Sequence, residues 1–83
     1  MPINYDEAHA ILDAVMNFDN PHYDVMIQTS AGKSGKSFEV HVFDMRGSVD
    51  DIKLIESKHV PEDVTAWDAI KMIAKYKEES NNA

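Results

Sequence analysis

Hydrophobic residues recur along the chain first with helical spacing, then with strand spacing, and then with helical spacing again. In residues 5–17 the apolar side chains follow the i, i+3, i+4, i+7 pattern that places them on one face of an α-helix. Asn4 and Glu7 form a capping-box pattern at its start, and Pro21 ends the helical segment. The predicted inner face consists of Ala8, Ile11, Leu12, Val15 and Met16.

Three segments in the middle of the chain alternate between apolar and polar residues, as strands with one buried face do. The first is 23–29, the second is 37–44, and the third lies within 52–60. The side chains predicted to face the core are Tyr23, Val25, Ile27, Phe38, Val40, Val42, Ile52 and Leu54.

A second helix is predicted after Val64, with Thr65 as its N-cap and Asp68 at its third position. Trp67 lies early in this helix, either as a core residue or as an exposed anchor for a partner. The predicted inner stripe consists of Ala66, Ala69, Ile70, Ile73 and either Tyr76 or Lys77.

The order of elements is therefore α-β-β-β-α. It predicts an α+β fold in which two helices pack on one face of a three-stranded antiparallel sheet and leave the other face open. The length of 83 residues predicts a single domain over 1–83, with an ordered core at about 4–78 and a frayed tail at 79–83.

The segment SAGKSGKS, residues 30–37, ends like a phosphate-binding P-loop. That motif begins with Gly and opens a helix, whereas this segment begins with Ser30 and precedes the strand pattern FEVHVFD. We therefore expect a hairpin loop in which Gly32 and Gly35 supply positive φ angles, and no nucleotide cofactor.

The layout resembles the double-stranded RNA-binding domain. The resemblance covers roughly residues 5–77 and rests on Pro21-His22-Tyr23, the glycine-containing loop, and Phe38-Glu39-Val40-His41-Val42. The RNA-contacting residues of that family are missing. Its loop histidine falls on Ser34, and the three lysines that open its second helix are absent from Ala66-Trp67-Asp68-Ala69-Ile70. Losing these phosphate contacts argues against direct binding to nucleic acid.

The net charge of −7 is concentrated at the start of the chain, where the first 28 residues hold five acids and neither Lys nor Arg. Such a surface repels nucleic acid and anionic membranes and suits a basic partner, although acidity also simply keeps small proteins soluble. The chain has no secretory pattern and no apolar run that could span a bilayer, so we expect a cytoplasmic protein without membrane contact.

Candidate catalytic groups are sparse, and we expect no enzyme, no metal and no cofactor. The acid pairs Asp50-Asp51 and Glu62-Asp63 fit solvated loops better than acid–base catalysis. The four histidines lack the close spacing of a zinc site. They are His9, His22, His41 and His59.

Two surfaces are candidates for partner binding. The first is the open sheet face, where apolar residues gather near His41, although a one-residue slip in register would exchange the two faces. Its predicted members are Met26, His41, Phe43 and Ile55. The second is an acidic rim that could imitate the phosphates of a nucleic acid, joined by Asp6 and Glu7. Its predicted members are Asp50, Asp51, Glu62 and Asp63.

The leading hypothesis is a non-enzymatic acidic module that binds a basic, nucleic-acid-handling protein. In size, charge and layout the chain resembles small phage inhibitors, such as anti-CRISPR or anti-restriction proteins that mimic nucleic acid. One alternative is a divergent double-stranded RNA-binding domain that uses Lys33, Lys36 and the lysines of the second helix. Another is a homodimer formed through the open sheet face.

Overall fold

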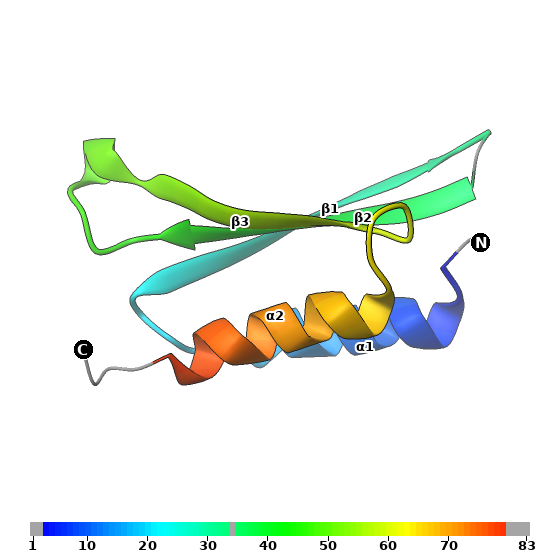
Figure 1. The fold of residues 1–83 in the computed structure, drawn as a ribbon, viewed down its shortest axis with the longest axis horizontal. Helices are drawn as coiled ribbons and strands as arrows, with labels where there is room; N and C mark the ends of the chain where they lie inside the picture. Colours follow the sequence, from blue (N-terminus) through cyan, green and yellow to red (C-terminus); the bar gives the residue numbers. More distant parts are fainter. Residues whose placement is uncertain (1–2, 34, 80–83) are drawn as a thin grey trace.

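The computed structural model describes residues 3–33 and 35–79. It has two layers, a three-stranded sheet and a pair of helices that lie side by side under one face of it (Figure 1). The elements are α1 (Tyr5–Met16), β1 (Tyr23–Gly32), β2 (Gly35–Asp44), the short 3-10 helix η1 (Val49–Asp51), β3 (Lys53–Val60) and α2 (Ala66–Glu78). This confirms the predicted α+β fold with the order α-β-β-β-α, which is also the layout of the double-stranded RNA-binding domain. All but the first residue of the predicted tail 79–83 lies outside the described residues.

Strand β2 is central and pairs antiparallel with both β1 and β3. The β1–β2 pairing continues as far as Gly32 opposite Gly35, so the two strands extend well into the segment predicted as a loop. Gly35 has φ 109°, the left-handed conformation expected of a turn glycine. Ser34, where the loop histidine of the double-stranded RNA-binding domain would fall, lies outside the described residues.

Both helices begin with the predicted capping boxes. The Asn4 side chain accepts a hydrogen bond from the Glu7 amide at 2.8 Å, and the Glu7 carboxylate accepts one from the Asn4 amide at 3.1 Å. Thr65 and Asp68 repeat this exchange at 3.2 Å in both directions. The hydrogen bonds from Thr65 also hold the pKa of the Asp68 carboxyl below its usual value. Local sequence thus determines where each helix starts.

The core lies between the sheet and the helices. In α2, Tyr76 completes the inner stripe in place of Lys77, Ile70 is only partly buried, and Met72 is buried although the pattern did not include it. Val25 and Ile27 are also only partly buried. The buried hydrophobic residues are Ile11, Tyr23, Phe38, Val40, Val42, Val60, Ala66, Ala69, Met72, Ile73 and Tyr76.

The predicted inner face of α1 is wrong in part. Ile11 is fully buried, but Leu12 is 40% exposed and Met16 is 81% exposed. Ala14 and Phe18 pack against the core in their place. The apolar residues of this helix cover more of its circumference than the core can bury, and the rotation of the helix against the sheet selects which of them go inside.

The prediction that Ile52 and Leu54 face the core is also wrong, because both are exposed. Ile52 precedes β3, and the register of β2 with β3 shifts inside the strand. Leu54 pairs with Phe43, the next register position is taken by Glu56, and Ile55 is left as the extra residue of a β-bulge. An extra residue reverses the alternation beyond it, so Leu54 changes faces.

A buried asparagine joins the α1–β1 connection to the end of α2. The Asn20 side-chain nitrogen donates to the carbonyl oxygen of Tyr76 at 2.8 Å and to that of Glu79 at 2.6 Å. Its side-chain oxygen accepts from the amide of His22 at 3.0 Å. These bonds satisfy carbonyl groups that a helix C-terminus leaves without intrahelical partners.

Candidate functional site

The open sheet face is the face of the sheet that points away from the helices. Register determines its composition, because residues opposite one another in an antiparallel pair point to the same side. Met26 lies opposite His41, and His41 lies opposite Ser57. The flanking rows complete the surface, which consists of Asp24, Met26 and Gln28 of β1, Glu39, His41 and Phe43 of β2, and Leu54, Ser57 and His59 of β3.

Three of the four predicted members of this surface lie together. Met26, His41 and Phe43 share the face, and the rings of His41 and Phe43 are 6.4 Å apart between centroids. Ile55 does not belong to the register of the face because it is the bulged residue. Leu54 takes its place opposite Phe43. Strict alternation along β3 could not reveal this exchange, because nothing in that segment marks the position of a bulge.

The apolar part of the face is accessible. Met26 is 51% exposed and Leu54 is 56% exposed, while Phe43 between them is partly buried. Large apolar side chains gathered on one exposed surface are typical of interaction sites.

Short polar contacts order the rest of the face. The ring nitrogen Nδ1 of His41 lies 2.7 Å from the Ser57 hydroxyl oxygen. Nε2 of His59 lies 2.9 Å from a Glu39 carboxylate oxygen, close enough for an ion pair when the histidine is protonated. Cross-strand pairs of this kind fix side-chain orientation on a sheet. The side chains of His41 and His59 are therefore oriented on this face by their contacts with Ser57 and Glu39.

None of the nine side chains on the open sheet face is Lys or Arg, whereas Asp24 and Glu39 are acidic. The lysines of the strands lie toward the helices. Lys36 lies near Tyr5 and Ala8 of α1, and Lys58 pairs with Glu56. Lys53 lines a hollow with Tyr23, Tyr76 and Lys75. The sheet thus separates its cations from the face that is apolar and acidic.

The predicted acidic rim is not one surface. Asp50 and Asp51 belong to η1 at one end of β3, and Glu62 and Asp63 follow β3 at its other end. The eight residues of β3 separate the two pairs by roughly 25 Å, at about 3.3 Å per residue. Glu62 instead borders a small hollow with Glu39 and His59, which adds an acid to one end of the open sheet face.

On the side of the sheet that faces the helices, the Glu56 carboxylate of β3 lies opposite Val42, at a position where an apolar core residue is expected. The hydroxyl of Tyr76 donates to Glu56 at 2.7 Å, and the Lys75 amine lies 3.4 Å from the same oxygen. The bond from Tyr76 holds the pKa of the Glu56 carboxyl below its usual value, and burial together with that carboxylate raises the pKa of the Tyr76 hydroxyl. Because the Glu56 carboxylate has hydrogen-bond partners within the fold, we assign it a structural role.

At the same end of the molecule, Arg46 makes two side-chain hydrogen bonds to Asp44, at 2.8 and 3.0 Å. These bonds lower the pKa of the Asp44 carboxyl to about 2. The Arg46 guanidinium lies 5.2 Å from the centre of the Tyr23 ring, within cation–π range. Asp44 and Arg46, which line the hollow with Lys53, are therefore paired with each other.

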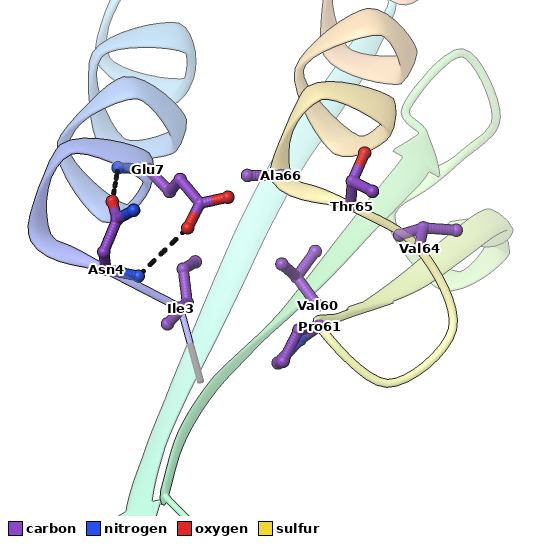
Figure 2. A pocket seen from close by; sticks show the side chains of 8 residues that line it. All are labelled: Ile3, Asn4, Glu7, Val60, Pro61, Val64, Thr65 and Ala66. Carbon is purple, nitrogen blue, oxygen red and sulfur yellow. Dashed lines mark hydrogen bonds between the residues drawn. The ribbon is translucent and has the colours of Figure 1, made fainter. Parts of the chain in front are cut away.

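A cleft of about 410 Å³ lies between the N-termini of the two helices and the loop after β3 (Figure 2). The Glu7 carboxylate occupies its polar side through the α1 capping box, and Ile3, Val60 and Pro61 form its apolar side. At each helix N-terminus the cap occupies one amide, that of Glu7 in α1 and that of Asp68 in α2. The Glu7 carboxylate on the polar side of the cleft disfavours an anion there.

The first turn of α2 has no exposed lysines, unlike the first turn of the second helix in the double-stranded RNA-binding domain. Ala66 and Ala69 are buried, Asp68 caps the helix, and Trp67 is 62% exposed. Trp67 is thus the exposed alternative of the two left open by the sequence.

In residues 3–33 and 35–79, no group of three or more His, Asp or Glu side chains is arranged to hold a metal ion. Neither α1 nor α2 has the length and apolar character needed to cross a membrane, and no other helix of that kind occurs in this part of the chain. No protein family, curated protein or solved structure matches this chain.

Proposed function

We propose that this chain is a non-enzymatic protein-binding module whose open sheet face docks on a basic protein. The observation that carries the proposal is the composition of that face. Exposed Met26 and Leu54 lie on the same surface as the carboxylates of Asp24 and Glu39, and the strand lysines point to the other side. An apolar patch on the same surface as negative charge favours a partner with an apolar patch and positive charge beside it.

The finer form of the proposal concerns the partner. A protein that handles nucleic acid carries an exposed basic surface, and an acidic module that covers it blocks access to phosphate. The chain would then act as an inhibitor, as anti-CRISPR or anti-restriction proteins do. The separation of the two acid pairs shifts the expected contact from a phosphate-like rim to the open sheet face.

The test compares two charge reversals of equal size. Asp24→Lys with Glu39→Lys changes the open sheet face, and Asp50→Lys with Asp51→Lys changes η1 at the end of the sheet. Tagged wild-type protein and both variants are incubated with lysate of the source organism, with and without nuclease treatment, and captured proteins are identified by mass spectrometry. Thermal melting first shows that each variant is folded.

We expect the wild-type protein and the η1 variant to capture the same basic protein, and the open-face variant to lose it. Equal capture by both variants would refute the proposal, and loss in the η1 variant alone would return the contact to Asp50 and Asp51. A signal that disappears with nuclease, together with a gel shift on duplex RNA, would favour the RNA-binding alternative. A homodimer in light scattering that Phe43→Glu converts to a monomer would favour self-association.

A further inference from the structure

The outer side of α1 carries a row of exposed side chains separate from its buried side. Tyr5 is 78% exposed, Leu12 is 40% exposed and Met16 is 81% exposed, and His9 between them is also exposed. The rings of Tyr5 and His9 are in edge-to-face contact, with centroids 5.1 Å apart. We call these four residues the α1 seam. They lie about 130° around the helix from Ile11, at 100° per residue.

The spacing of the seam is that of a helix–helix contact. Successive members are four, three and four residues apart, as in the row that one helix of a coiled coil presents to another. Such a row remains on one side of the helix over three turns, or roughly 18 Å for the 12 residues of α1. Isolated exposed apolar residues are ordinary, but a continuous row at this spacing matches the surface that an amphipathic partner helix covers.

Charge identifies the kind of partner helix. Asp6 lies three residues before His9, and Asp13 lies four residues after His9 and three before Met16, so both border the seam along one side. The first 28 residues contain three further acids and no Lys or Arg, while Lys36 lies beside Tyr5 at one end of the seam. A second copy of α1 would bring carboxylates against carboxylates, which is unfavourable for self-pairing. A helix with Lys or Arg beside its apolar row would place opposite charges together.

We propose that the α1 seam is a second docking surface, and that its ligand is a basic amphipathic helix of another protein. The seam belongs to the helix layer, whereas the open sheet face is on the far side of the sheet (Figure 1). The two surfaces can therefore be occupied at the same time, and the chain can bridge two partners. This inference does not depend on the proposed function of the open sheet face.

The test uses a synthetic peptide of about two heptads with Leu at the a and d positions and Lys at the flanking positions. It is added to the isotopically labelled full chain, and binding is followed by the chemical shifts of the backbone amides. A peptide of the same composition in scrambled order is the charge control. We expect saturable shifts in α1 at concentrations on the order of 100 μM, as suits a contact smaller than a standard interface. The scrambled peptide should bind at least ten-fold more weakly.

Two double variants locate the contact. Leu12→Ser with Met16→Ser should weaken binding of the heptad peptide at least ten-fold, while Met26→Ser with Leu54→Ser on the open sheet face should leave it within about two-fold. Equal binding of the scrambled peptide, shifts centred on the sheet, or unchanged binding by the seam variant would each overturn the inference. A dimer of the wild-type chain that the seam variant dissociates would assign the seam to a second copy and would overturn it as well. The peptide titration does not involve a partner of the open sheet face, so either proposal can fail without the other.

Discussion

Asn20 connects parts of the chain that are far apart in sequence, and its removal gives the sharpest test of the packing. Asn20→Ala eliminates the donors to the carbonyl oxygens of Tyr76 and Glu79 and the acceptor for the amide of His22. The site is buried, since Asn20 is 6% exposed. A net hydrogen bond contributes about 1 kcal/mol, and a buried group left without a partner costs about 1–3 kcal/mol. We therefore expect a loss of about 2–3 kcal/mol in the free energy of unfolding.

Such a loss is large for a domain of 83 residues, whose total stability is on the order of 4–12 kcal/mol. It corresponds to a fall in melting temperature of about 10–20 °C. The assay is urea denaturation followed by far-UV circular dichroism, with the free energies compared at equal m-value.

The matched control is Asn17→Ala. The Asn17 side chain donates a hydrogen bond of similar length, 2.8 Å, to the Asp13 carbonyl oxygen, but this bond is exposed and within one helix turn. Its loss should change stability by less than about 0.5 kcal/mol. If Asn20→Ala and Asn17→Ala cost the same, the burial argument is wrong and the contact to α2 does not stabilise the fold.

Two further predictions test the packing of the helices. Ile11→Ala should destabilise the protein by about 2–4 kcal/mol because it opens a cavity in the core, whereas Leu12→Ala should cost about 1 kcal/mol or less. Similar losses for the two variants in chemical denaturation would contradict the observed rotation of α1. The Glu56 carboxylate accepts a hydrogen bond from Tyr76, and its pKa is lowered in the folded state. Its ionised form therefore stabilises the folded protein at pH values above the unfolded-state pKa of Glu56. This contribution is lost as the pH falls through the folded-state pKa. The wild-type protein should therefore lose more stability than Glu56→Gln between neutral pH and about pH 3, and parallel pH profiles of the two proteins would show that the Tyr76 contact does not stabilise the carboxylate.

The sequence predicted most of the open sheet face but not all of it. Alternation along β1 and β2 is sufficient to put Met26, His41 and Phe43 on one side, because both strands pair without interruption. It failed for β3, where the bulge replaces Ile55 by Leu54. Nothing in the local pattern marks a bulge here, since its position depends on how two strands fit together.

The order of the elements, the starts of the helices and the antiparallel sheet were determined by the sequence itself, because capping boxes and hydrophobic periodicity act over a few neighbouring residues. Besides the bulge in β3, three features were decided only by the tertiary structure. These are the rotation of α1 that exposes Leu12 and Met16, the bonds of Asn20 to the end of α2, and the distance between the acid pairs at the two ends of β3. Each of them depends on contacts between segments that are distant in the chain. The local pattern of residues does not show which of these contacts form or how much they stabilise the fold.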